Sequence, residues 1–299
     1  MSDGNLVRGD RRHIGRGGLK CGPIAFGCWR FTHTDVGYAR RLVEHALSLG
    51  MDLVDTADIY GTGYGAAEEL LGRVLQDSPG LRDRLVLATK GGILPGVPYD
   101  SSGTWLRRAC EASLRRLQVE SVDLYQVHRP DLFGHPEEVA KTLLALRSEG
   151  KVREIGVSNY SPSQYDAITA FLGPRALATF QPELSAAVLE PLRDGTLDRC
   201  MRDGVTPLAW SPLAGGRIAS GEGLRAELLA VLDELAGREG VSRTAISIAF
   251  LLAHPSRIVP IAGTQQNQRL DDVATAVTAH LDRKDCYRII EASEGKPLP

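Results

Sequence analysis

Eight short apolar segments recur along the chain and predict eight β-strands. Each is almost continuously apolar, which is typical of strands in a parallel sheet that is covered on both faces. The predicted strands are residues 23–27, 51–55, 84–90, 122–128, 153–159, 177–183, 205–211 and 257–263.

The segments between these strands carry apolar residues at helical spacing and charged residues elsewhere, which predicts amphipathic helices. Several of them end at a glycine (Gly50, Gly150, Gly204) directly before the next strand, as expected because glycine tolerates the left-handed conformation at a helix end. The predicted helices include residues 36–50, 104–118, 136–150 and 191–204.

Strand and helix alternate eight times over ~250 residues, which predicts a (β/α)8 TIM barrel of the α/β class. Residues 241–255 predict an extra helix before the last strand, and residues 280–299 form a tail. No linker or low-complexity segment divides the chain, so we expect residues 1–299 to form a single barrel domain. The sequence leaves open whether the arginine-rich arm, residues 1–14, is ordered.

A doubly wound sheet is the alternative architecture. The stretch GTGYG, residues 61–65, resembles the phosphate loop of a dinucleotide-binding fold. It follows the second predicted strand, however, and Lys90 stands where that fold places an acidic residue at the end of the next strand. These departures favour the barrel.

The composition narrows the class of protein. The chain has 299 residues, 43% hydrophobic and 24% charged, with a formal net charge of -2, which is ordinary for a soluble enzyme. It has neither a basic footprint for nucleic acid nor an apolar run of the ~20 residues that cross a bilayer, so we expect no nucleic-acid or membrane partner. The cysteines are odd in number and lack a C-x-x-C pair, which fits no disulfide framework or metal site and indicates a cytoplasmic protein.

Four polar residues stand where apolar strands end. Asp55 and Lys90 end the second and third predicted strands, His128 ends the fourth, and Tyr60 lies in the loop after the second. Catalytic groups of a barrel stand at these strand ends, and neighbouring strands lie ~4.8 Å apart, so we expect these side chains to meet.

Each residue also has a purely structural interpretation. Asp55 and Lys90 would form a salt bridge, His128 would begin a turn, and Tyr60 would pack as a loop residue. Four titratable groups at three consecutive strand ends nevertheless favour a functional site, because gathering charges away from water is costly.

The chemistry of this set fits proton donation to a carbonyl oxygen. A phenol has a pKa of about 10, which a nearby ammonium would lower, and Asp55 would keep Lys90 charged. Tyr60 would then donate a proton, and His128 would hydrogen-bond the substrate carbonyl. Protein side chains offer no hydride, so a reduced nicotinamide is implied.

With these motifs in place, the chain resembles the aldo-keto reductase superfamily over nearly its whole length, from IAFGCW to GTQQNQRLDDV. The catalytic tetrad of that family matches Asp55 and Tyr60 in DTADIYG, Lys90 in ATKGG and His128 in YQVHRPD. The local pattern is most similar to the uncharacterised bacterial oxidoreductases of the superfamily. The resemblance gives Asp58 no catalytic part, so we expect it to be solvated or to cap the loop.

The resemblance implies NADP(H) as cofactor, extended over the barrel top. Ser158, Asn159 and Gln181 would hold the carboxamide, and the nicotinamide would stack on Trp210. Arg217, just after the glycines of this stretch, would add a second positive charge to that of Arg269 or remain a solvated loop residue. The implied cofactor-binding set is Asp55, Ser158, Asn159, Gln181, Trp210, Ser211, Pro212, Leu213, Gly215, Arg217, Gly263, Thr264, Gln265, Arg269 and Asp272.

Within the last loop, Gly263 and Thr264 would open a helix N-terminus suited to a phosphate, and Arg269 would meet the 2'-phosphate. Gln265 and Val273 depart from the family pattern, so NAD(H) remains an alternative cofactor.

The implied substrate is a small carbonyl compound or alcohol, with a pocket wall formed by Trp29, Arg30, Ile93 and Pro130. Trp29 could instead be a core anchor. Short loops after His128 and after the seventh strand predict an open pocket that discriminates weakly among aldehydes and ketones. The family also implies a small hairpin, around residues 18–22, that closes the barrel bottom.

The predicted function is therefore reversible, NADPH-dependent carbonyl reduction with Tyr60 as the general acid. Two alternatives remain: a Schiff-base aldolase that uses Lys90 as nucleophile, and an NADP(H)-binding sensor with little turnover. The sequence does not predict the oligomeric state.

Overall fold

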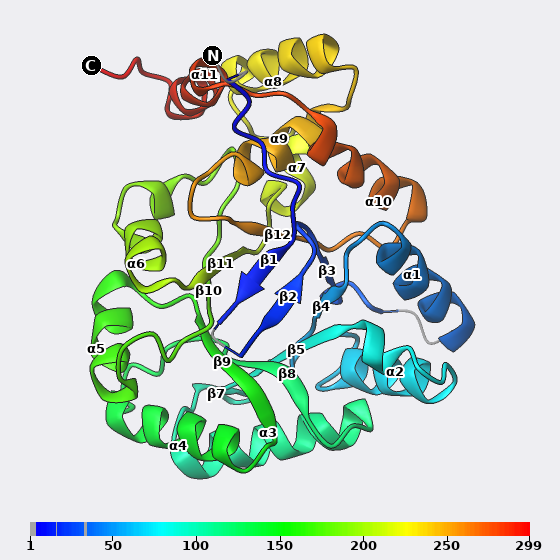
Figure 1. Ribbon diagram of the computed structural model, residues 1–299, viewed down its shortest axis with the longest axis vertical. Coiled ribbons are helices and arrows are strands. Elements are labelled where there is room, and N and C mark those ends of the chain that lie inside the picture. The colour runs from blue at the N-terminus through cyan, green and yellow to red at the C-terminus, as the bar shows by residue number, and fades with distance from the viewer. Residues whose placement is uncertain (1–3, 16, 33–34) are drawn as a thin grey trace.

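The computed structural model describes residues 4–15, 17–32 and 35–299, and within them eight parallel strands close into a barrel (Figure 1). All eight predicted strands are confirmed, and their order around the barrel is the order of the chain. They are β3 (Ala25–Gly27), β4 (Leu53–Asp55), β5 (Val86–Gly91), β8 (Val122–Val127), β9 (Val152–Ser158), β10 (Thr179–Gln181), β11 (Thr206–Ala209) and β12 (Val259–Ala262).

The barrel is packed on both sides of its strands because side chains alternate in direction along each strand. Leu53, Ala88 and Leu124 pack inside the barrel, whereas Val54 and Leu87 pack outward in a second core beneath the helices. The predicted barrel fold is therefore built on two apolar clusters.

An antiparallel hairpin, β1 (Arg12–Ile14) and β2 (Leu19–Cys21), closes one end of the barrel, as the family resemblance implied. Ile14 and Cys21 pack against the apolar residues inside the barrel, and Figure 1 shows the hairpin lying across its opening. Part of the N-terminal arm is thus ordered, while residues 1–3 lie outside the described residues.

A ring of helices surrounds the strands. Gly50, Gly150 and Gly204 have the positive φ expected at helix ends. The helices are α1 (Val36–Ser48), α2 (Ala66–Gln76), α3 (Gly103–Leu117), α4 (Pro136–Ser148), α5 (Pro162–Leu172), α6 (Thr196–Asp203), α7 (Arg217–Ser220), α8 (Ala226–Glu239), α9 (Arg243–Leu252), α10 (Asn267–Ala274) and α11 (Arg283–Glu294).

Two predicted helices differ from the structure. The extra helix is present as α9, but α7 and α8 precede it. The helix predicted over residues 191–204 is wrong in its first part, because Gly195 adopts φ 88° and α6 begins only at Thr196. A second hairpin after β5, formed by β6 (Ile93–Leu94) and β7 (Val97–Tyr99), was not predicted.

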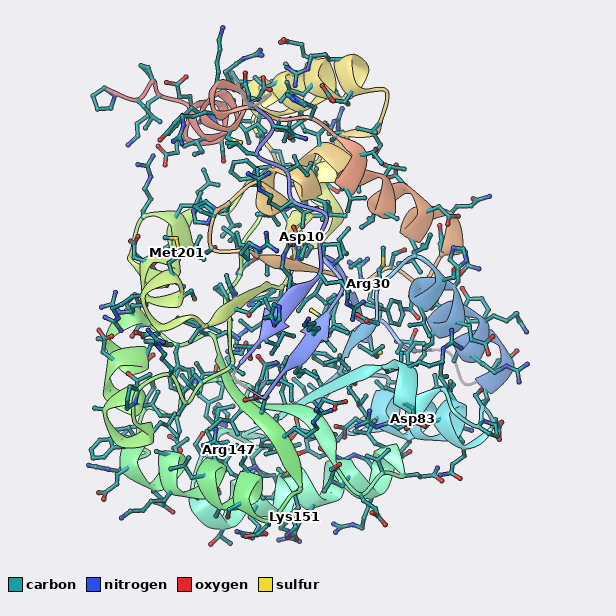
Figure 2. The ribbon with its side chains drawn as sticks, viewed as in Figure 1. Asp10, Arg30, Asp83, Arg147, Lys151 and Met201 are labelled. Atoms are coloured by element: carbon teal, nitrogen blue, oxygen red, sulfur yellow. The ribbon has the colours of Figure 1, made fainter. Side chains whose placement is uncertain are left out.

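Charged side chains cover the outer surface of the helical ring (Figure 2). Lys151, for example, donates to Glu111 and Glu149 over 2.7 and 2.9 Å. Within the described residues, no helix combines the length and apolar character that crossing a bilayer requires.

Candidate active site

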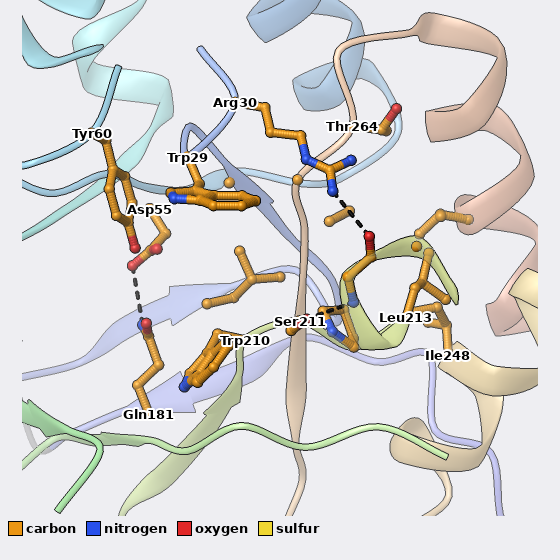
Figure 3. Close-up of a pocket in the computed structure, with 18 of the residues that line it drawn as sticks. Trp29, Arg30, Asp55, Tyr60, Gln181, Trp210, Ser211, Leu213, Ile248 and Thr264 are labelled. Carbon is orange, nitrogen blue, oxygen red and sulfur yellow. Dashed lines mark hydrogen bonds between the residues drawn. The ribbon is translucent and has the colours of Figure 1, made fainter. Parts of the chain in front are cut away.

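A pocket of about 930 Å³ lies at the end of the barrel where the parallel strands terminate (Figure 3). This volume is at the upper end of the range for small-molecule sites. Of the sequence-predicted site residues, the lining includes Trp29, Arg30, Asp55, Tyr60, Ile93, His128, Ser158, Asn159, Gln181, Trp210, Ser211, Pro212, Leu213, Gly215, Gly263, Thr264, Arg269 and Asp272.

The four strand-end residues come together as expected. The fully buried Nζ of Lys90 donates to Asp55 Oδ2 over 2.7 Å, to the carbonyl of Thr56 over 2.9 Å and to the Tyr60 hydroxyl over 3.3 Å. The Tyr60 and His128 rings meet edge to face with their centroids 5.6 Å apart. Tyr60 therefore stands between a buried ammonium and an imidazole.

The electrostatics of this set differ from the expectation in one respect. Burial disfavours the charged form of Lys90, but Asp55 and Tyr60 outweigh it and raise the pKa of the lysine, which stays charged. Burial also raises the pKa of the Tyr60 phenol, and the Lys90 ammonium opposes this shift without cancelling it. The pKa of Tyr60 is therefore raised rather than lowered as expected, because desolvation of the phenol outweighs the attraction of the Lys90 ammonium.

His128 is held neutral. Burial, together with the charges of Lys90 and Arg129, lowers the pKa of the imidazole well below its ordinary value. A neutral imidazole can hydrogen-bond a carbonyl but adds no charge to the site.

Asp58 is not solvated, contrary to expectation. Its side chain is fully buried in the loop between β4 and α2, where Oδ2 accepts a hydrogen bond from the Tyr64 hydroxyl over 2.8 Å. This burial could not be predicted from the local pattern, because groups that surround Asp58, such as Lys90 and Arg116, come from elements later in the chain.

A chain of polar side chains connects β9, β10 and β11 beside the tetrad. The indole N–H of Trp210 donates to Asn159 Oδ1 over 2.9 Å, and the Ser158 hydroxyl donates to the carbonyl of Gln181 over 2.9 Å. Gln181 in turn donates its amide N–H to Asp55 Oδ1 over 3.1 Å (Figure 3). Asn159 also donates to the Ser158 hydroxyl over 2.9 Å, so the amide-bearing residues form one hydrogen-bonded unit with the Asp55–Lys90 ion pair.

The loop after β11 presents bare backbone to the pocket. Gly215 and Gly216 have φ of 73° and 102°, and a Cβ added at either would meet open space. Arg30 reaches across the pocket mouth and donates to the carbonyl of Gly215 over 3.0 Å (Figure 3). Arg217 does not line the pocket, since its Nε donates back to the carbonyl of Ala214.

The far end of the pocket differs from the expected arrangement. Gly263 and Thr264 line it, but they do not open a helix, because α10 begins only at Asn267. Gln265 lies outside the lining, and its backbone carbonyl accepts a hydrogen bond from Tyr38. Asp272 lines the pocket while accepting a hydrogen bond from Ser242 over 2.8 Å.

The substrate wall is confirmed in part. Trp29 lies at the mouth with 60% of its surface exposed, which excludes a role as a core anchor. Pro130 was wrongly placed in the wall, because the described pocket lining includes His128 and Arg129 but not Pro130. Residues of the tail, 280–299, do not line this pocket.

Several lining residues were missed. Thr244 and Ile248 lie four residues apart and so share the pocket-facing side of α9, a spacing that could have been recognised once that helix was expected to cover the site. Ile59 and Arg129 are next to Tyr60 and His128 in the sequence, and no motif of their own marked them as site residues. The remaining missed residues are Gly27, Gly216, Ala219, Ser220, Ile261, Ala262 and Val273.

Comparison with known proteins agrees with this architecture. Residues 23–294 match the model of the aldo/keto reductase family. The chain is 47% identical over 295 residues to 6-dehydroglucose reductase of Novosphingobium aromaticivorans, covering 96% of this chain and 97% of that protein. It is 35% identical over 292 residues to 6-dehydroglucose reductase of Agrobacterium fabrum, covering 94% and 97%.

Among solved structures, glycerol dehydrogenase from Gluconobacter oxydans superimposes with a TM-score of 0.83 at 26% identity, covering 98% of each chain. The family model spans the barrel from its first strand to its last helix, including every strand end that contributes to the pocket. The chain belongs to the aldo/keto reductase family and is an NAD(P)H-dependent oxidoreductase.

Proposed function

We propose that the protein reduces a sugar-derived aldehyde of the 6-dehydroglucose class, with NADPH as the preferred cofactor and Tyr60 as the general acid. The observation that carries this proposal is the contact of the Tyr60 hydroxyl, which lines a large pocket, with the buried, charged Lys90 behind it. The reaction is reversible, since each group that gives a proton in one direction accepts it in the other.

The proton would come from Tyr60. The phenol is protonated at neutral pH because burial raises its pKa, so it carries the proton that a carbonyl oxygen needs. When the proton leaves, the phenolate remains beside the Lys90 ammonium, whose charge favours that form. Neutral His128 would hydrogen-bond the same carbonyl oxygen and hold it near Tyr60.

A bound nicotinamide cofactor would supply hydride to the carbonyl carbon. The pocket fits an extended dinucleotide because amide side chains, the Trp210 ring and an exposed stretch of glycine backbone follow one another along it. Arg269 also lines the pocket, and its guanidinium forms no ion pair with another described residue, so it is available for the 2'-phosphate that distinguishes NADPH from NADH.

The substrate class rests on the relatives and on the composition of the pocket mouth. The two relatives named 6-dehydroglucose reductase cover nearly the whole chain. The exposed ring of Trp29 offers a flat surface for a sugar ring, and Arg129 offers hydrogen-bond donors for its hydroxyls. We still expect the enzyme to discriminate weakly and to reduce other aldehydes as well.

The structure argues against the Schiff-base alternative. A nucleophilic lysine must be neutral and accessible to the substrate. Lys90 is instead fully buried and charged, and it donates hydrogen bonds to three oxygen atoms.

The test combines cofactor titration with turnover. The affinities for NADPH and NADH are measured by titration, with tryptophan fluorescence as the signal. Turnover is measured as oxidation of NADPH in the presence of 6-dehydroglucose or 4-nitrobenzaldehyde. Both assays are done on the wild type and on Tyr60→Phe. We expect the variant to keep NADPH affinity and to lose turnover by at least about a hundredfold. Tight NADPH binding without turnover of either aldehyde by the wild type would favour the sensor alternative and contradict the proposal.

A further inference from the structure

A second group of polar side chains lies behind the tetrad, around Asp58. The backbone N–H of Asp58 donates to the carbonyl of Lys90 over 3.1 Å, so this residue connects the loop that carries Tyr60 to the strand that carries Lys90. Its Oδ2 accepts from the Tyr64 hydroxyl, while its Oδ1 is buried and has no hydrogen-bond partner among the described residues. A buried carboxyl with an unpartnered oxygen is rare and calls for an explanation.

The groups that face Asp58 do not neutralise a charge on it. Arg116 from α3 is committed to the fully buried Glu68 of α2, which it contacts over 2.7 Å, and its guanidinium also lies over the Tyr64 ring at 5.5 Å. Lys90 from β5 is committed to Asp55. Tyr125 from β8 also interacts with this carboxyl and brings no positive charge.

Two buried carboxyls, Asp58 and Glu68, therefore compete for the single guanidinium of Arg116, and Glu68 holds it. An unpaired carboxylate in such a place is unfavourable, so Asp58 is stabilised in its protonated form. In agreement, burial raises the pKa of Asp58 to about 7.

We propose that Asp58 is a positioning residue that acts through Lys90 and Tyr60: its backbone N–H ties the Tyr60 loop to β5, and its neutral carboxyl, which accepts from Tyr64, keeps a third charge away from the Asp55–Lys90 pair. This inference rests on the proposed role of Tyr60 as proton donor. Lys90 balances the charge of Asp55 and contacts the Tyr60 hydroxyl, so a phenolate that forms on Tyr60 is favoured by the nearest charge. Ionisation of Asp58 would add negative charge behind Lys90 and disfavour the phenolate, which slows reduction.

Asparagine is the matched substitution, because it keeps the size of the side chain and an oxygen that accepts from Tyr64, while it cannot ionise. Alanine would keep the backbone hydrogen bond to Lys90 but would remove the hydrogen bond with Tyr64 as well as the charge. Tyr64→Phe removes the hydrogen bond that favours the ionised form of Asp58, and it leaves the tetrad untouched.

The experiment measures kcat and KM for 4-nitrobenzaldehyde at saturating NADPH between about pH 5.5 and 9 in wild type, Asp58→Asn and Tyr64→Phe. In the wild type we expect kcat to fall about three- to tenfold as pH rises through about 7. Asp58→Asn should keep the low-pH value of kcat across the range, with KM changed less than about twofold. Tyr64→Phe should move the inflection to higher pH.

Four results would overturn the inference. A pH profile of Asp58→Asn that superimposes on the wild type would remove the role of the Asp58 charge. A uniform loss of kcat at every pH would indicate a purely structural residue. If Asp58→Asn does not fold, an inflection that stays in place in Tyr64→Phe contradicts the inference equally. A wild type without any turnover would overturn the proposed function together with this inference. The other results leave the proposed function intact, so the two failures can be told apart.

Discussion

Gln181 donates its side-chain N–H to one carboxylate oxygen of Asp55 over 3.1 Å, while Lys90 donates to the other oxygen over 2.7 Å. The amide at the end of β10 and the ion pair of β4 and β5 are therefore parts of one hydrogen-bonded unit. Asp55 is positioned from both sides, so a change on the cofactor side is expected to reach the proton donor.

Gln181→Leu tests this connection. Loss of the donor leaves a buried carboxylate oxygen unsatisfied, which should reduce the free energy of unfolding by about 1–3 kcal/mol and reduce kcat about tenfold. Thr179→Val is a matched control, because Thr179 donates a buried hydrogen bond to Gln126 from the same strand but does not line the pocket. Equal losses of kcat in both variants would show that only stability was measured.

Lys90→Met should be costly because it leaves Asp55 charged and buried without its cation. We expect the free energy of unfolding, measured with urea, to fall by about 3–5 kcal/mol. The double variant Asp55→Asn/Lys90→Met should regain much of this loss, although neither variant should turn over substrate. A double variant as unstable as Lys90→Met would contradict the assigned pairing.

The pH dependence of stability should report on His128. Its pKa in the folded protein lies well below the ordinary value, so below about pH 6.5 the unfolded chain binds a proton that the folded chain does not. Unfolding therefore becomes easier as pH falls, by up to about 1.4 kcal/mol per pH unit from this residue. Urea unfolding of wild type and His128→Gln between about pH 5 and 7.5 should show a shallower decline in the variant.

Arg269→Ala should separate the two cofactors. Removing a charged hydrogen-bond donor from the 2'-phosphate should weaken NADPH binding about ten- to hundredfold and leave NADH binding nearly unchanged. Arg217→Ala is the control, because this arginine bonds within its own loop and does not line the pocket. An equal loss of affinity for NADH in Arg269→Ala would show that the arginine does not contact the 2'-phosphate.

The barrel and the meeting of the tetrad were predictable from sequence for a physical reason. Parallel strands that are buried on both faces leave a continuous apolar signal, and their ends converge, so the polar residues that follow Leu53 and Ala88 must meet. Alternation along the strand then directs Asp55 and Lys90 to the same side.

Features that depend on distant contacts were not predictable. The burial of Asp58 depends on Tyr64 and on α3, which a local pattern does not show. The late start of the helix expected over residues 191–204 depends on Gly195, whose positive φ is decided by the turn around it. The raised pKa of Tyr60 follows from the depth of the pocket, a property of the assembled barrel.

The positions of the site residues along the chain separate two tasks. Tyr60, Lys90 and His128 all precede residue 129, whereas every residue assigned to the cofactor except Asp55 lies between Ser158 and Asp272. A crossover between two homologous genes within α4 would therefore pass on the acid from one parent and the dinucleotide cradle from the other. Such recombinants offer an evolutionary route by which cofactor preference can change while the proton donor is inherited intact.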